Sequence, residues 1–238
     1  MNRTVVITGG TRGTGAVIAQ EFLVAGDRVA VLARHAPTEQ LDQQSLAFYQ
    51  ADVTNPVELR AACESIIACW GRIDVWINNA GYGRIVPFVD GDADEWARMI
   101  DVNFWGVVHG SRLAIEAMRS QGGALINIAS IAGLMSPRQH SAYAVSKAAV
   151  IALTRSLAVE FAAERIRVNA IAPGPLDTEG FRAAGGDPIK RAQTIPTRQM
   201  VQPVEVARAC LFLSESISSL TGTTLVLDGG STAAGCYI

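Results

Sequence analysis

The sequence predicts an α/β protein: a single doubly wound, Rossmann-like domain whose parallel sheet carries helices on both faces. Short β-branched runs alternate with longer helical stretches along the 238 residues. The runs are continuously hydrophobic, which predicts strands buried on both faces. The first run also ends in a glycine-rich turn directly before a helix. With 49% hydrophobic residues, the chain can bury such a core.

Seven apolar runs predict the strands, and a sheet of order 3-2-1-4-5-6-7 is expected. The runs are Thr4–Thr8, Arg28–Ala33, Leu46–Tyr49, Val75–Asn78, Ala124–Ala129, Arg167–Ile171 and Thr224–Leu227. Helices are expected near Gly13–Ala25, Pro56–Trp70, Glu95–Ser120, Tyr143–Ala163 and Pro203–Leu213. Because no linker, repeat or low-complexity tract divides residues 1–238, we expect one domain with ligands at the carboxyl ends of its strands.

Composition argues against several classes of function. The net charge of −2, with no polybasic block, gives no reason to expect nucleic acid. The amino terminus enters a predicted strand within a few residues, and we expect no apolar run to reach the ~20 residues that span a bilayer. We therefore expect a cytoplasmic protein with no membrane partner. No metal site is expected, because these side chains are scattered: Cys63, Cys69, Cys210, Cys236, His35, His109 and His140.

Tyr143 and Lys147 form a candidate proton-transfer pair. Residues four apart share a helix face, so the ammonium can favour the ionised phenol. An ordinary Tyr has a pKa near ~10, and use at neutral pH needs a depression of roughly 3 units, about 4 kcal/mol. Ser130, at the end of an apolar strand, could join the pair. Taken alone, a Tyr-x-x-x-Lys pair is also compatible with a purely structural role.

The turn after the first strand is a candidate phosphate site. It reads Thr8-Gly9-Gly10-Thr11-Arg12-Gly13-Thr14-Gly15. Glycines there let the backbone approach a pyrophosphate, whose charge the helix amino terminus stabilises. A plain tight turn is the alternative interpretation.

Together these motifs resemble the short-chain dehydrogenases/reductases over essentially the whole chain. The matching segments are Thr8-Gly9-x-x-x-Gly13-x-Gly15, Asp52-Val53-Thr54, Asn78-Asn79-Ala80-Gly81, Asn103, Ser130, Tyr143-x-x-x-Lys147, Pro173-Gly174, Thr221-Gly222 and Asp228-Gly229-Gly230. The resemblance implies that catalysis uses Asn103, Ser130, Tyr143 and Lys147. It implies cofactor binding by Gly9, Thr11, Arg12, Gly13, Thr14, Gly15, Arg34, Asp52, Val53, Asn79, Ala80, Gly81, Tyr143, Lys147, Pro173, Gly174 and Thr178.

Some implied roles are specific. Asp52 would bond the adenine, with a solvated loop carboxylate as the alternative. Asn103, awkwardly placed within a predicted helix, would anchor a water that links Lys147 to solvent. The amides of Asn78 and Asn79 could instead tie strand ends together. Thr178 would bond the nicotinamide carboxamide, although its segment matches the family only loosely.

The end of the second strand predicts the cofactor. A carboxylate there would favour NAD, whereas arginine favours the 2′-phosphate of NADP. The chain has Arg34 and no acid at that point, and Arg12 supplies a second cation. NADP(H) is therefore favoured over NAD(H). If Arg34 is only an exposed cation, the preference stays open, and an NAD-dependent alcohol dehydrogenase acting on a small free metabolite is the alternative.

The expected reaction is hydride transfer between the nicotinamide and a ketone or secondary alcohol. Apolar segments at 82–88 and 131–137 suit an uncharged reacting end, and Thr178–Met200 is expected to form a substrate lid. The lid's excess of cations could receive a carrier-bound 3-oxoacyl thioester, as in the 3-oxoacyl-carrier-protein reductases that the chain resembles. A solvated flank also explains that charge pattern.

Two further expectations concern assembly and activity. The helices near Glu95–Ser120 and Tyr143–Ala163 carry more apolar surface than one sheet face needs, which predicts a homo-oligomer, a tetramer or a dimer. A nucleotide-binding regulator without turnover is the remaining alternative. The presence of Asn103, Ser130 and Tyr143 together with Lys147 argues against it, because a nucleotide sensor needs no proton donor.

Overall fold

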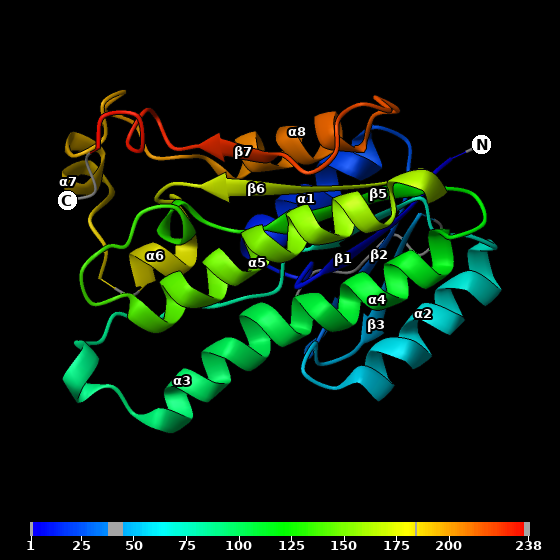
Figure 1. Cartoon of the computed structure of the whole chain (residues 1–238), viewed down its shortest axis with the longest axis horizontal. Helices are drawn as coiled ribbons and strands as arrows, with labels where there is room; N and C mark the ends of the chain where they lie inside the picture. Colours follow the sequence, from blue (N-terminus) through cyan, green and yellow to red (C-terminus); the bar gives the residue numbers. More distant parts are fainter. Residues whose placement is uncertain (1, 38–44, 184, 236–238) are drawn as a thin grey trace.

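A seven-stranded sheet forms the centre of the computed structural model, which describes residues 2–37, 45–183 and 185–235. The strand order is β3-β2-β1-β4-β5-β6-β7, and every neighbouring pair is parallel. The predicted fold class and strand order are therefore confirmed. Figure 1 shows the sheet with helices on both sides.

All seven predicted strands are present, with ends that differ from the expected ones by at most two residues. They are β1 (Thr4–Thr8), β2 (Arg28–Ala33), β3 (Leu46–Gln50), β4 (Val75–Asn78), β5 (Gly123–Ile128), β6 (Ile166–Pro173) and β7 (Thr224–Leu227). The α-helices are α1 (Gly13–Val24), α2 (Pro56–Trp70), α3 (Ala93–Ile100), α4 (Gly106–Met118), α5 (Ser141–Glu160), α6 (Glu179–Ala183), α7 (Pro188–Gln193) and α8 (Pro203–Ser214). Short 3-10 turns are η1 (Phe88–Asp90), η3 (Ile131–Gly133) and η4 (Ala162–Glu164), and η2 (Asp101–Trp105) is a π-helical turn.

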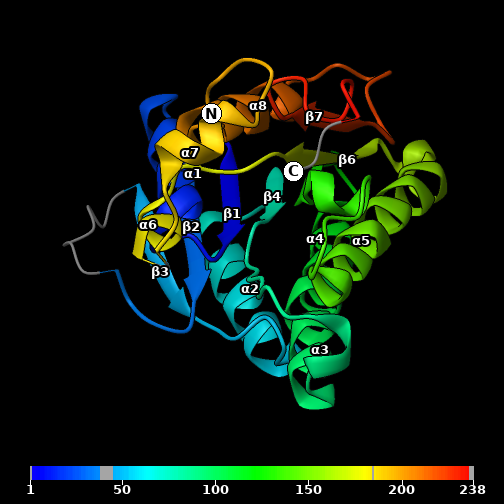
Figure 2. The same ribbon diagram turned by 90° about the vertical axis from the view of Figure 1, so that its left-hand side faces the viewer.

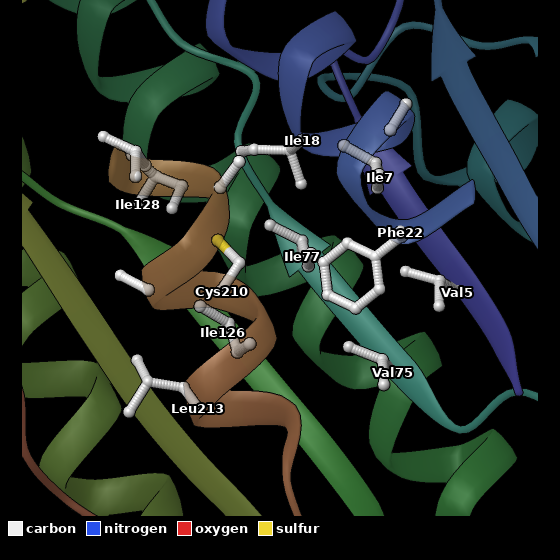
Figure 3. Packing of buried hydrophobic residues seen from close by; sticks show 14 of the residues in the cluster. Val5, Ile7, Ile18, Phe22, Val75, Ile77, Ile126, Ile128, Cys210 and Leu213 are labelled. Carbon is white, nitrogen blue, oxygen red and sulfur yellow. The ribbon is translucent and has the colours of Figure 1, made fainter. Parts of the chain in front are cut away.

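The core has two halves, one on each face of the sheet. Val5 and Ile7 of β1 face α1 and α8, whereas Val6 between them faces the α2 and α4 side. Figure 3 shows the first half, with Phe22 of α1 and Cys210 of α8 packed over the central strands. Because both faces of these strands are buried, their hydrophobicity is continuous rather than alternating.

The prediction of one continuous helix at Glu95–Ser120 is wrong in the middle of that range. Helices α3 and α4 are joined by η2, where the backbone widens to π-helical geometry for five residues. A π-helical turn inserts an extra residue into the ladder, and such turns are frequent at functional sites. Helices α6 and α7, five and six residues long, were not predicted. They lie inside the expected lid.

Helix α5 is the one described helix that is long and apolar enough to cross a membrane by length and composition. The expectation that no segment reaches this length therefore needs correction. Val150 and Ile151 of α5 are buried in the core, and the side chains of Lys147 and Thr154 are bonded there. These contacts explain why the helix is apolar: one of its faces packs in the protein core.

The helix ends show where the protein leaves backbone groups open. Helix α2 begins after Asn55, whose side chain accepts hydrogen bonds from the N–H groups of Val57 and Glu58. Helix α1 begins after Arg12, which provides no side-chain cap, and its first turn holds no acidic residue. The amino terminus of α1 is therefore open to an external anion.

Candidate active site

The candidate site lies at the carboxyl edge of the sheet, where the strands end. Figure 2 turns that edge toward the viewer, with α6 and α7 on one side and α5 on the other. The predicted site residues that follow β1, β4 and β5, and those at the end of β6, lie at this edge because parallel strands all end on the same side.

The glycine-rich turn is packed against the end of β4. Gly9 has a φ of +67°, and a Cβ there would lie 2.9 Å from the Ala80 Cα atom. A Cβ on Gly15 would collide with the carbonyl oxygen of Gly9. The Asn79 amide donates to the carbonyl oxygens of Thr8 and Gly9, at 3.0 and 3.2 Å. Asn79 thus ties the end of β4 to the turn, which is the structural role that the sequence offered as an alternative to cofactor binding.

The outer part of this turn has room for a pyrophosphate. Gly13 has a φ of +54°, and a Cβ there would meet nothing within 4 Å. Thr11 and Thr14 are half-buried beside it. Together with the uncapped start of α1, these residues fit the phosphates of a dinucleotide.

The two cations proposed for the 2′-phosphate are both exposed. Arg12 begins α1, and Arg34 follows directly after β2. In the described parts of the chain neither forms an ion pair. The carbonyl of Arg34 accepts from the Gln50 amide at 3.2 Å, which links the ends of β2 and β3.

The loop after β3 is fixed by its own side chains. One carboxylate oxygen of Asp52 accepts from both the N–H and the hydroxyl of Thr54, at 2.9 and 2.8 Å. Val53 is buried, and a Cβ on Gly106 of α4 would approach its side chain within 2.8 Å. Asp52 is therefore held in one orientation, and its predicted bond to the adenine stays a prediction.

Lys147 lies beside Tyr143 on one face of α5, as the spacing predicts. The Lys147 Nζ atom is 5.7 Å from the centre of the Tyr143 ring and donates to the Ile128 carbonyl at 2.9 Å. Only 4% of Lys147 is exposed, and this burial lowers the pKa of its ammonium to about 8. The bond to Ile128 anchors α5 to the end of β5.

Ser130 follows β5 and is 9% exposed. Its Oγ atom accepts from the Ala132 N–H at 3.1 Å, which starts η3. Because a hydroxyl can donate while it accepts, the Ser130 proton remains available to an external oxygen.

Asn103 lies in the π-helical turn and is fully buried. Its Oδ1 atom accepts from the Tyr82 N–H at 2.9 Å, and its Nδ2 atom donates to the Tyr82 carbonyl at 2.8 Å. Nδ2 also donates to the Ser146 hydroxyl at 3.1 Å. A Cβ on Gly81 would lie 2.9 Å from Asn103 Oδ1 and 3.4 Å from Lys147 Nζ. Gly81 therefore fits between these two side chains.

Three more residues surround this group: Tyr82 and Gly83, which were predicted only as part of the pocket segment 82–88, and Ser146, which sequence reasoning missed. A Cβ on Gly83 would lie 2.9 Å from Cδ2 of the Tyr143 ring. The Tyr82 phenol donates to Glu95 at 3.3 Å, and burial together with the negative Glu95 carboxylate raises the pKa of the phenol. The Gly-Tyr-Gly order after the two asparagines was the available signal for Tyr82 and Gly83. Ser146 gave none beyond its place next to Lys147.

The far side of the edge is formed by the end of β6. The Gly174 N–H donates to the Leu227 carbonyl at 2.7 Å, and a Cβ there would lie 3.0 Å from the Asp228 Cα atom. Pro173 is buried. The Thr178 hydroxyl accepts from the Phe181 N–H at 3.1 Å and so begins α6. Its predicted bond to the carboxamide stays a prediction.

The two chain segments that flank the predicted lid are paired with each other at its base. Leu176 and Val201 form an isolated parallel bridge. Arg182 forms a two-bond ion pair with Asp177, at 2.8 and 2.7 Å. Arg198 donates to the Gln193 carbonyl at 2.7 Å. Two of the lid's cations therefore already have partners, Arg182 at the base of the lid and Arg198 within it.

No metal site is found in the described residues, where no three His, Cys, Asp or Glu side chains gather. Cys63 and Cys69 share α2 and are free, as is Cys210. Burial raises the pKa of the Cys63 thiol to about 11. Cys236 lies outside the described residues.

A dinucleotide cradle and a Tyr–Lys pair at one sheet edge define a class, the Rossmann-fold oxidoreductases. Comparison with known proteins agrees. A family model described as enoyl-(acyl carrier protein) reductase matches residues 9–232. The 3β-hydroxysteroid dehydrogenase 1 of Eggerthella lenta is 37% identical, over 97% of this chain and 94% of its own. The 3-oxoacyl-(acyl-carrier-protein) reductase FabG of Chlamydia trachomatis is 33% identical, over 97% of both chains.

The solved structure of ElxO with NADP bound superposes with a TM-score of 0.91. ElxO is 31% identical to this chain, and the match covers 98% of this chain and 100% of ElxO. The chain belongs to the short-chain dehydrogenase/reductase family, whose members are oxidoreductases that bind a nicotinamide cofactor and small-molecule substrates.

Proposed function

We propose that this protein is an NADP(H)-dependent reductase that interconverts a ketone and a secondary alcohol. The observation that carries the proposal is the buried Lys147 ammonium beside Tyr143, next to an open dinucleotide cradle. A buried ammonium interacts with a neighbouring phenolate more strongly than an exposed one, because the surrounding dielectric is low. A regulator that only binds nucleotide has no use for this pair.

The residues have complementary roles. Tyr143 gives its proton to the carbonyl oxygen as that oxygen becomes an alkoxide, and takes a proton back in the oxidation direction. Ser130 donates a hydrogen bond to the same oxygen, where charge accumulates. Lys147 favours the ionised phenol, and Asn103 fixes the backbone beside it. The nicotinamide, when bound, supplies or accepts the hydride.

Two exposed cations support NADP(H) over NAD(H). The glycine turn and the uncapped α1 terminus fit the pyrophosphate, with Thr11 and Thr14 beside it. Arg12 and Arg34 would then pair with the 2′-phosphate, since neither is neutralised by a described acid and arginine binds phosphate through two parallel bonds. ElxO, with NADP in its structure, is consistent with this assignment.

We further propose a substrate with an apolar, uncharged reacting end. Ile85 and Leu134, on two of the predicted pocket segments, are 65% and 43% exposed, and Ile189 of the lid is 74% exposed. Hydroxysteroids and 3-oxoacyl thioesters, named for the two relatives, both have apolar bodies. The Arg182–Asp177 ion pair leaves the lid one cation fewer for the anionic handle of a carrier-bound substrate, which supports a free ketone.

The homo-oligomer remains a proposal, supported by apolar side chains on the outer face of η2 and α5. Trp105, Val145 and Val159 are 47%, 52% and 83% exposed. Light scattering at micromolar concentration tests it, and a monomer at every concentration would remove it. A cytoplasmic location is likewise a proposal.

The activity is tested by following NADPH absorbance in both directions: NADPH is supplied with cyclic ketones and 3-oxoacyl thioesters, and NADP⁺ with hydroxysteroids and short secondary alcohols. We expect turnover of at least one carbonyl class with NADPH, and slower turnover with NADH. Tight NADPH binding without turnover of any compound would instead support the regulator.

A further inference from the structure

Ser146 is a fully buried hydroxyl between Tyr143 and Lys147, and none of the roles above uses it. Its Oγ atom donates to the Tyr143 carbonyl at 2.7 Å and accepts from Asn103 Nδ2 at 3.1 Å. A serine within a helix usually makes only the first kind of bond. The second bond joins α5 to the π-helical turn η2.

Asn103, in turn, holds Tyr82 at both backbone atoms. The segment Gly81–Gly83 is thereby fixed between η2 and α5. Its first glycine lies next to the ammonium of Lys147, and its last glycine lies against the ring of Tyr143. The segment packs closely against both side chains, because a Cβ added at either glycine would be at or inside van der Waals distance of them.

We propose that Ser146 is a positioning residue for the reaction: it holds the Asn103 turn against α5, so that the Gly81–Gly83 segment keeps Tyr143 and Lys147 in place. This inference rests on the proposed function. Without the Ser146 hydroxyl, one Asn103 N–H has no partner in a buried site, and η2 is free to move away from α5. The Tyr143 ring and the Lys147 ammonium then lose the surface that fixes them.

The same helix provides a matched control. Two turns further along α5, the Thr154 hydroxyl donates to the Val150 carbonyl at 2.8 Å and accepts from Asn127 Nδ2 at 2.9 Å. Thr154 is also fully buried. It therefore has the same pair of bonds as Ser146, but its partner amide lies on β5 rather than beside the Tyr–Lys pair.

The experiment compares Ser146→Ala with Thr154→Val in the full-length protein. We expect both variants to melt at a lower temperature than the wild type. Only Ser146→Ala should lower kcat, by about 10- to 100-fold, because small displacements of reacting groups have effects of this size. Its dissociation constant for NADPH should stay within about twofold. Ser146→Thr, which keeps the hydroxyl, should restore most of kcat.

The outcomes separate the two hypotheses. If the wild type turns over no carbonyl, the proposed function fails. If the wild type is active and Ser146→Ala keeps its kcat, the positioning role is wrong. An equal loss of kcat in Thr154→Val also overturns it, because the effect would then follow stability alone. Should Ser146→Ala not fold, Ser146→Cys replaces it, since a thiol bonds weakly; normal kcat in that variant refutes the proposal.

Discussion

Gly81→Ala tests the packing of the site most directly. The added Cβ would lie 2.9 Å from Asn103 Oδ1, whereas comfortable contact begins at about 3.5 Å, so the oxygen must retreat by roughly 0.6 Å. Its bond from the Tyr82 N–H, now 2.9 Å long, would stretch toward the ~3.5 Å at which hydrogen bonds are lost. The same Cβ would touch the Lys147 ammonium at 3.4 Å.

The cost can be estimated from these contacts. A buried donor left without its partner costs about 1–3 kcal/mol, and replacing glycine by alanine returns about 0.4–1 kcal/mol through the unfolded chain. The two ranges leave a net loss of about 0–2.6 kcal/mol, and its midpoint of about 1.3 kcal/mol lowers the melting temperature by roughly 3–5 °C in a protein of this size. Because Asn103 holds the backbone that packs against Lys147 and Tyr143, its shift should disturb their geometry, and we expect kcat to fall by at least about tenfold.

The assay is steady-state oxidation of NADPH, paired with thermal melting followed by circular dichroism. Gly91→Ala is the matched control, because its Cβ would lie 3.2 Å from the ring nitrogen of Trp96 in α3, and the three atoms nearest to it belong to Trp96 and Phe88 rather than to Asn103 or Lys147. We expect it to change stability by less than about 0.5 kcal/mol and leave kcat unchanged. Wild-type kcat and melting temperature in Gly81→Ala would refute the contact between Gly81, Asn103 and Lys147.

Three further variants test separate roles. Tyr143→Phe should lower kcat at least about 100-fold while NADPH affinity stays within a few-fold; an active variant would remove Tyr143 as the proton donor. Arg34→Asp should lower kcat/KM for NADPH about 10- to 100-fold and favour NADH, whereas a wild type that already prefers NADH contradicts the phosphate assignment. Lys147→Met should stop turnover yet raise the melting temperature at pH 7. Burial holds the pKa of Lys147 at about 8, below its ordinary 10.5, so the charged form destabilises the fold below pH 8. Between pH 8 and 10.5 Lys147 is mostly neutral in the folded wild type but still charged in the unfolded chain. The difference in melting temperature between Lys147→Met and the wild type should therefore shrink as the pH rises. A difference in melting temperature that stays constant from pH 8 to 10.5 would contradict the burial of the Lys147 charge.

Features set by local geometry could be predicted from the sequence. Tyr143 and Lys147 share a face because four residues make about one helical turn. A tight strand-to-helix turn after β1 could be predicted because glycine has no Cβ and adopts positive φ angles without strain. Gly9 and Gly13 do have positive φ angles.

Features set by distant contacts could not be predicted. The π-helical turn at Asp101–Trp105 forms where Asn103 bonds the backbone of Tyr82, 21 residues away in the chain. No periodicity of apolar residues records such a bond, so the pattern there indicated one uninterrupted helix. Helices α6 and α7 are shorter than the 11-residue windows in which periodicity can be recognised.

The burial of Lys147 has two opposing effects, and their balance sets the working pH range. Low dielectric strengthens the attraction between its ammonium and the Tyr143 phenolate. The same burial lowers the lysine's own pKa to about 8. At pH 7 most of the lysine is charged and can stabilise the phenolate, but above pH 8 a growing fraction is neutral and cannot. The kcat/KM for alcohol oxidation should therefore level off near pH 8, although an isolated phenol would continue to ionise at higher pH. An oxidation rate, measured as kcat/KM, that rises steadily to pH 10 would show that Lys147 keeps its charge, and that its burial does not control the reaction.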